Sequence, residues 1–142
     1  MKTREILGTT ILVALTLTIV FTAIGFAQTQ GKVVNKIDDL VGIWESQFQG
    51  NIAYMQFNAD GTLKLAATIE VLKSDVGLAY TGNFWFEGNV YGMTETAGSD
   101  TGTYTIRMQK EGNIAKLFFT PVDEPNPNRK AALTKGMTRV EP

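Results

Sequence analysis

The strongest constraint on the fold is a series of short segments in which apolar and polar residues alternate, separated by turn sequences. The turns contain Asp60-Gly61, Gly88-Asn89 and Gly112-Asn113, pairs that tolerate the positive φ angles of tight hairpins. The alternation predicts half-buried antiparallel strands. We expect eight of them, at residues 43–48, 52–58, 62–71, 80–86, 90–96, 103–110, 114–120 and 137–140.

Strands joined by short turns must protect their edges, and pairing the last strand with the first removes both edges. We therefore expect an all-β fold, a single up-and-down antiparallel β-barrel of about eight strands. Residues 72–79 are expected to form a loop, and residues 129–135 a short helical turn before the last strand, ended by Gly136. A barrel of this size encloses side chains or one small ligand.

The N-terminus is interpreted as a targeting or anchoring segment. Lys2 and Arg4 precede an uncharged apolar run at residues 6–27, and its small final residues are typical of a signal-peptidase site, so residues 1–27 are interpreted as a secretory signal peptide. The run is also long enough to cross a bilayer as an N-terminal apolar helix, since roughly 20 residues suffice. It would then anchor the protein, with the two basic residues in the cytoplasm. Both alternatives place the domain outside the cytoplasm, secreted, periplasmic or membrane-anchored, and a third makes the run a buried helix of the domain.

Residues 28–37 are polar without a clear period and are interpreted as a spacer, and residues 38–142 as the barrel domain. Asp38 and Asp39 interrupt the preceding pattern, and Gly42 permits a tight start to the first strand. If residues 1–27 are retained, we expect membrane contact only through them.

The amino-acid composition limits the kinds of catalysis and binding that the chain can support. The chain has no cysteine and no histidine, which excludes disulfides, thiolate nucleophiles and hydrolases that depend on histidine, and argues against a transition-metal site. The net charge is −1, whereas nucleic-acid binding relies on an excess of Lys and Arg. We expect no metal, no cofactor and no nucleic-acid partner, and any catalysis would depend on carboxylate, Lys, Tyr or Ser side chains.

Alternation in the first strand places Trp44, Ser46 and Phe48 on one face. Trp44 is interpreted as a core residue whose indole N–H donates to a nearby carbonyl; the alternative is a direct ligand contact. The sequence Gly42-Ile43-Trp44 resembles the G-x-W motif that opens the first strand of lipocalins. Residues 57–62, Phe-Asn-Ala-Asp-Gly-Thr, resemble a hairpin of small bacterial lipocalin-like domains, and residues 119–141 resemble their closing segment.

This resemblance implies that a basic residue packs across Trp44, with Arg139 the better candidate and Arg129 the other. An ion pair between Arg129 and Asp123 would hold the closing loop in place. The alternatives are that the Arg129 side chain is solvated or that it contacts a ligand. The residues expected to close the barrel are Gly42, Trp44, Asp123, Arg129 and Arg139. The chain lacks the disulfide and the long C-terminal helix usual in lipocalins.

Aromatic residues concentrate at residues 80–91. Alternation places Phe84 and Phe86 on one face of their strand and Trp85 on the other, while Glu95 shares a face with Tyr91 and Met93 of the next strand. Inside a barrel, the Glu95 carboxylate would need a partner such as Arg107 or Tyr104. The candidate ligand-binding residues are Tyr80, Phe84, Trp85, Phe86, Tyr91, Met93 and Glu95.

The function expected from these patterns is non-catalytic binding of a small apolar or amphipathic ligand, in or at the mouth of an exported barrel. The alternative is a fully packed barrel that serves as a structural or interaction protein of the cell envelope. A third hypothesis, an isomerase or cyclase that acts on a hydrophobic substrate, would require an inward Glu or Tyr beside a cavity.

Overall fold

The computed structural model describes residues 31–142. The expected signal peptide or anchor at residues 1–27, with its apolar helix, and residues 28–30 of the expected spacer lie outside the described residues. The chain divides into two units, Met1–Gly31 and Lys32–Pro142, and the fold described below is that of the second. A search of the described residues for a helix long and apolar enough to span a membrane finds none.

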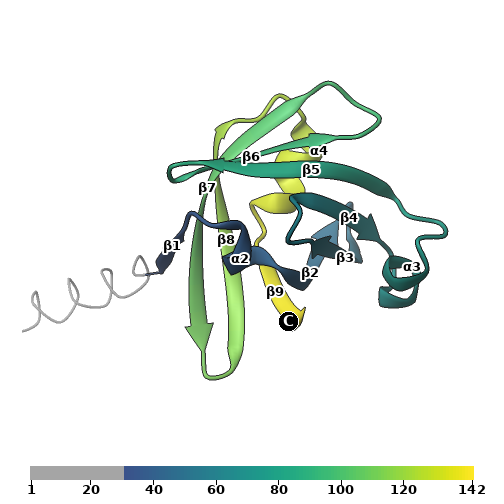
Figure 1. The fold of residues 1–142 in the computed structure, drawn as a ribbon, viewed down its shortest axis with the longest axis horizontal. Coiled ribbons are helices and arrows are strands. Elements are labelled where there is room, and N and C mark those ends of the chain that lie inside the picture. Colours follow the sequence, from purple (N-terminus) through teal and green to yellow (C-terminus); the bar gives the residue numbers. More distant parts are fainter. Residues whose placement is uncertain (1–30) are drawn as a thin grey trace, which may run out of the picture. The chain divides into compact units, whose positions relative to one another are not determined.

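Nine strands form one antiparallel sheet in the described part of the chain (Figure 1). Strands β2 to β9 each pair with the next strand along the chain, and β9 pairs back with β2. The expected up-and-down barrel of eight strands is thereby confirmed. The strands are β1 Lys32–Val34, β2 Gly42–Phe48, β3 Asn51–Phe57, β4 Thr62–Ala66, β5 Tyr80–Glu87, β6 Val90–Glu95, β7 Thr101–Glu111, β8 Ile114–Asp123 and β9 Met137–Glu141.

The helix expected before the last strand is confirmed as α4, Pro127–Leu133. It begins two residues earlier than the pattern indicated, because the Asn126 side chain accepts hydrogen bonds from the backbone N–H groups of Asn128 and Arg129, at 3.0 and 3.1 Å. Proline in the first turn suits this start, since its missing N–H would have no partner there. Residues 31–142 contain two other helices, α2, Ile37–Leu40, and α3, Ile69–Ser74.

The predicted strand at residues 62–71 is wrong in its second half. Strand β4 ends at Ala66, and α3 begins at Ile69. The Thr68 hydroxyl caps α3 by accepting from the N–H of Val71 at 3.3 Å, and Leu72 packs with Ile43 and Ala66 in a small second core. A segment of six residues is too short for the spacing of its apolar residues to distinguish a helix from a strand.

The expected polar spacer contains a strand of the sheet. Lys32–Val34 forms β1, which pairs with Ile106, Arg107 and Met108 of β7. Strand β6 pairs with Thr101–Thr105 of β7, so β1 occupies the length of β7 beyond the end of β6. Val34 is buried in the main core, and the folded unit therefore begins before residue 38.

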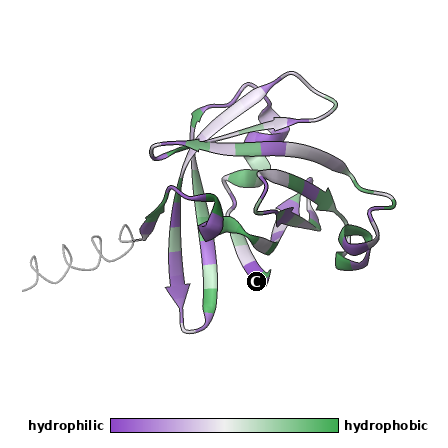
Figure 2. Cartoon of the chain, viewed as in Figure 1, coloured by the Kyte–Doolittle hydropathy of each residue, from purple (hydrophilic) through white to green (hydrophobic). Residues whose placement is uncertain are grey.

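The barrel interior is filled by the faces that alternation predicted. Tyr104 and Ile106 of β7 and Leu117 of β8 are fully buried, and hydrophobic and hydrophilic residues alternate along the strands in Figure 2. An aromatic cluster fills the centre, with neighbouring ring centroids 5.1 to 6.4 Å apart. Its members are Phe57, Phe84, Phe86, Tyr91, Tyr104 and Phe119.

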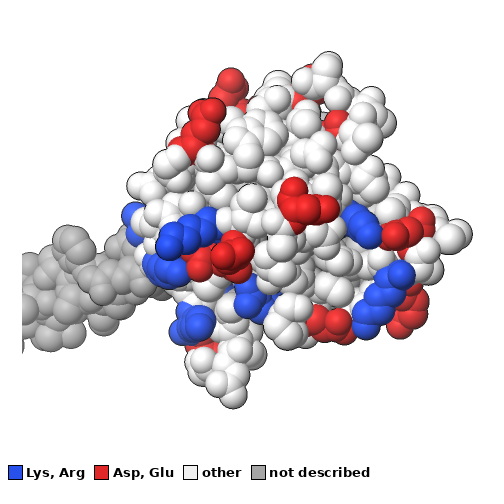
Figure 3. Space-filling model, viewed as in Figure 1, with Lys and Arg blue, Asp and Glu red and all other residues white. Residues whose placement is uncertain are grey.

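Acidic and basic side chains lie beside one another on the surface shown in Figure 3. Lys64 pairs with Asp75 at 2.6 Å and Lys73 with Glu141 at 3.4 Å. Exposed pairs of this kind contribute about 1 kcal/mol or less each. The face that the figure shows therefore carries mixed charge and no continuous basic patch.

One end of the barrel is closed by Trp44. Its indole N–H donates to the carbonyl of Leu40 at 2.7 Å, and the Arg139 guanidinium carbon lies 4.5 Å from the ring centroid. Arg139 also donates to the carbonyl of Asp39 at 2.9 Å. The expected indole–carbonyl bond and the packing of Arg139 across Trp44 are both confirmed, and the stack contributes roughly 0.5–2 kcal/mol.

Gly42 is required where β2 enters this closed end. Its φ is +132°, and a Cβ atom there would lie 2.6 Å from the carbonyl oxygen of Glu141. Gly42→Ala should therefore lower the free energy of unfolding by about 2 kcal/mol or more, through strain and displacement of β9. Gly50→Ala is the matched control, because Gly50 has φ +82° with open space around it and should cost only about 1 kcal/mol. Urea unfolding measures both, and equal losses would contradict the close-approach argument.

Candidate functional site

The candidate site is a cavity of about 290 Å³ at the end of the barrel opposite Trp44. It lies where β2 ends, where β5 begins and where α4 crosses the opening. Phe48, Met55 and Leu65 come from the barrel wall, and Leu133 and Met137 from α4 and the start of β9. The cavity is thus a half-open pocket with apolar walls. Its polar lining residues are Ser46, Tyr80, Glu95, Asn126, Asn128 and Arg129.

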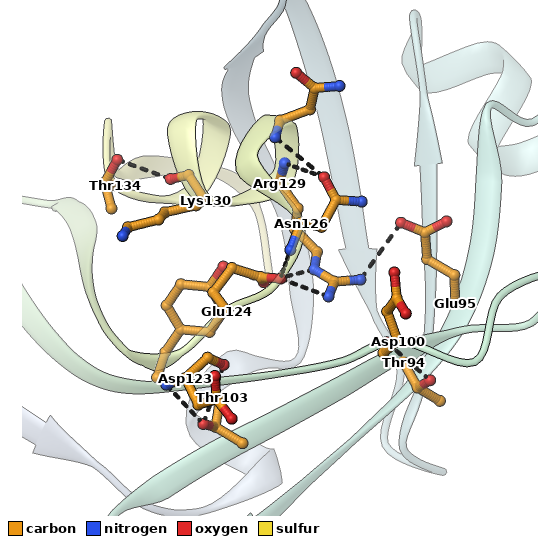
Figure 4. Close-up of polar contacts among 12 residues, drawn as sticks. Thr94, Glu95, Asp100, Thr103, Asp123, Glu124, Asn126, Arg129, Lys130 and Thr134 are labelled. Atoms are coloured by element: carbon orange, nitrogen blue, oxygen red, sulfur yellow. Dashed lines mark hydrogen bonds and ion pairs between the residues drawn. The ribbon is translucent and has the colours of Figure 1, made fainter.

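Arg129 is the central charged group of the site. It projects from α4 with a side chain that is only 4% exposed, and it donates two hydrogen bonds to Glu124, from Nε to Oε2 at 2.6 Å and from Nη2 to Oε1 at 2.7 Å. Figure 4 shows this bidentate arrangement. Planar pairing of this kind is the strongest geometry available to a guanidinium and a carboxylate.

The Glu124 carboxylate is fully buried and fully hydrogen-bonded. The Tyr104 hydroxyl donates to Oε2, and the backbone N–H of Asn126 donates to Oε1 at 2.8 Å. A Cβ atom on Gly102 would lie 2.2 Å from Oε2, so glycine at that position makes room for the carboxylate. Three elements of the fold, β7, α4 and the turn before α4, meet at this one group.

The local environment keeps this pair charged. Burial alone would raise the pKa of Glu124, but the hydrogen bonds from Arg129 and Tyr104 outweigh burial and hold the pKa below its usual range. Burial and the hydrogen bond to Glu124 raise the pKa of the Tyr104 hydroxyl, which therefore remains a donor. The pKa of Arg129 is raised by its hydrogen bonds to Glu124.

Glu95 faces the other side of the guanidinium. Its Oε1 lies 3.5 Å from Nη1 of Arg129, an ion pair longer than the roughly 2.7–3.2 Å usual for an N–H···O hydrogen bond. The Glu95 side chain is 30% exposed and lines the cavity with Tyr80. Burial and the Glu95 charge raise the pKa of the Tyr80 hydroxyl, which therefore stays protonated.

The structure distributes the seven candidate ligand-binding residues over three environments. Tyr80 and Glu95 line the cavity. Phe84, Tyr91 and Met93 are buried in the main core, and Phe86 packs against it. The Trp85 ring lies outside, against Gly92 of the neighbouring strand, where a Cβ atom would be 2.5 Å from the indole. Ligand contact by any of the seven stays a prediction.

Two expected charge pairs are wrong. Arg129 pairs with Glu124 and not with Asp123, because β8 ends at Asp123 and leaves that side chain exposed while the next residue turns inward. Arg129 is also the partner of Glu95, where Arg107 or Tyr104 was expected. Tyr104 is already committed to Glu124.

Sequence reasoning missed most of the cavity wall. Alternation placed Ser46 and Phe48 on the inner face, and it could have indicated that the end of that face borders an opening. The other side of the cavity is lined by Asn126, Asn128 and Leu133, from α4 and the turn before it. Their sequence does not indicate this position, because the docking of α4 depends on the pair between Glu124 and Arg129.

A comparison with models of protein families, with curated proteins and with solved structures finds no match to this chain. Within residues 31–142, no group of three or more His, Cys, Asp or Glu side chains is arranged to hold a metal ion. The chemistry that the site offers is apolar contact, hydrogen bonding and two ionic groups that line the cavity, Arg129 and Glu95.

Replacing Arg129 should destabilise the protein strongly. Arg129→Met leaves the Glu124 carboxylate buried beside an apolar chain, at a cost of about 3–5 kcal/mol in the free energy of unfolding. Lys116→Met is the control, because Lys116 and Glu111 form an exposed pair at 2.9 Å whose loss should cost about 1 kcal/mol or less. Denaturant unfolding compares the two. A loss below about 1 kcal/mol for Arg129→Met would contradict the importance of the buried pair.

Stability should also fall in acid through Glu124. Its pKa is lower in the folded protein than its ordinary value of 4.5, so the contribution of the pair is complete above that value and is lost as the pH falls through the folded pKa. Unfolding measured from about pH 6 to about pH 3 should show a steeper loss for the natural protein than for Glu124→Gln, whose amide does not titrate. Identical acid slopes would contradict this assignment.

Proposed function

We propose that this chain is an exported, lipocalin-like protein that binds a small amphipathic ligand at the mouth of its barrel, without catalysis. The observation that carries the proposal is the cavity of about 290 Å³, with apolar walls on most sides and polar groups gathered around Arg129. Small-molecule sites have this composition, apolar surfaces with a few convergent polar groups that fix orientation.

The lipocalin-like assignment is supported by the topology and by the closed end. Eight antiparallel strands close in up-and-down order, and Trp44 of the G-x-W motif is covered by a late arginine, Arg139. Export is supported by the composition of residues 1–27, a basic start, an apolar run and small residues at its end.

The position of the cavity limits the ligand. Its volume is at the lower end of the range for small-molecule sites, roughly 300–1,000 Å³. None of the six rings in the aromatic cluster lines it, so a ligand would stay at the mouth and not enter the centre of the barrel. We therefore propose a compact ligand with one polar end.

The filled centre also favours the second candidate function, a packed barrel that acts as a structural or interaction protein. The barrel interior is filled by packed side chains, among them the rings of Phe57, Tyr91 and Phe119. In that case the mouth would hold only water. The two functions differ in whether a small amphipathic molecule binds there saturably.

A cavity-blocking variant separates the two. Titration with 2-phenylethanol, followed by backbone amide chemical shifts, should give saturable binding with shifts around Tyr80 and Met137. Ala132→Phe fills the cavity from α4 and should weaken binding at least about tenfold, whereas Ala131→Phe, on the exposed face of the same helix, should not. Absence of saturable binding to the natural protein would favour the packed barrel.

A further inference from the structure

We infer that the ligand of the mouth cavity is a small organic cation, an ammonium group on an apolar body, and that Glu95 binds the charge. This inference rests on the proposed function and adds the chemical class of the ligand. It depends on how the charges around the cavity are already paired.

The single guanidinium of the site is occupied by a carboxylate that no ligand can reach. Nε and Nη2 of Arg129 are both bound to Glu124, which is fully buried behind it. With Glu95 included, one guanidinium faces two carboxylates, so the site has one negative charge in excess. An anionic ligand would have to separate Glu95 from Arg129 and lie close to Glu124 as well, which is unfavourable at low local dielectric.

Glu95 retains most of its capacity to accept hydrogen bonds. Its distance of 3.5 Å from Arg129 is about 1 Å longer than the hydrogen bonds between Arg129 and Glu124. Among the described residues, no side chain or backbone group donates a hydrogen bond to its carboxylate. Figure 4 places it on the opposite side of the guanidinium from Glu124, joined to Arg129 by the longer ion pair. A partly desolvated carboxylate with free lone pairs binds an ammonium donor better than it binds a neutral one.

The remaining walls suit a cation with an apolar body. Two aromatic residues, Tyr80 and Phe48, line the same cavity as Glu95, and aromatic faces attract cations by about 0.5–2 kcal/mol. The Tyr80 hydroxyl remains protonated, and its oxygen can accept a hydrogen bond from an ammonium. Met55, Leu65 and Leu133 provide the apolar surface.

Three probes of similar size and different charge test the inference. They are 2-phenylethylammonium, the neutral 2-phenylethanol and the anionic phenylacetate, each titrated into the protein near neutral pH by calorimetry. The ammonium should bind about ten- to one-hundredfold more tightly than the alcohol, the range expected for hydrogen bonds to a charged group, and phenylacetate should bind most weakly.

Glu95→Gln should remove the preference for the ammonium, so that the ammonium and 2-phenylethanol bind to the variant within about threefold of each other. Glu87→Gln is the matched control, because it removes the same charge from an exposed position at the end of β5 away from the cavity-lining Tyr80, and it should keep the preference.

The outcomes distinguish this inference from the function on which it rests. If the ammonium and the alcohol bind equally, if phenylacetate binds best, or if Glu95→Gln keeps the preference, the inference is wrong while binding at the mouth stands. If no probe binds to the natural protein, both are wrong. Selective ammonium binding that Glu95→Gln removes and Glu87→Gln retains would establish the class of ligand.

Discussion

The bidentate pair between Arg129 and Glu124 is the interaction on which the candidate site depends. It connects α4 to the end of β8, and the Tyr104 hydroxyl ties the same carboxylate to β7. Burying two charges is favourable only when nearly every donor and acceptor is paired, and here the geometry meets that condition. The helix is thereby held across the opening of the barrel, and the cavity is the space that remains beneath it.

The two ends of the barrel use arginine differently. At the closed end, the Arg139 guanidinium lies over the Trp44 ring and donates to the chain before β2, so it covers that end of the core. At the open end, Arg129 presents one edge to a buried carboxylate and the other to Glu95 in the cavity. Between them lies the aromatic cluster, and none of its rings lines the cavity, so the proposed ligand would bind only at the mouth. The two arginines therefore stabilise opposite ends of one small fold, and the cavity lies at the end that Arg129 holds.

The fold was largely predictable from sequence, and the site largely was not. Alternation and turn pairs are local signals, and they located the eight barrel strands, the short helix before the last one and the inward faces of residues such as Tyr104 and Leu117. They failed for α3, whose six residues fit both the helical and the strand spacing of apolar residues. They also failed for β1, whose three residues are too few to show any spacing. The G-x-W resemblance predicted the contact between Trp44 and Arg139. The partner of Arg129 was missed because the choice between Asp123 and Glu124 depends on which residue the end of β8 turns inward, a tertiary property.

Whether the mouth cavity is occupied in nature is the central question. The most direct measurement is native mass spectrometry of the protein purified from its own source, followed by extraction and identification of any bound molecule. This account predicts a stoichiometric, compact organic compound with an apolar body and a basic nitrogen. A protein that carries no small molecule, and that binds none of the compounds extracted from its source, would contradict the account and identify the barrel as a packed structural domain.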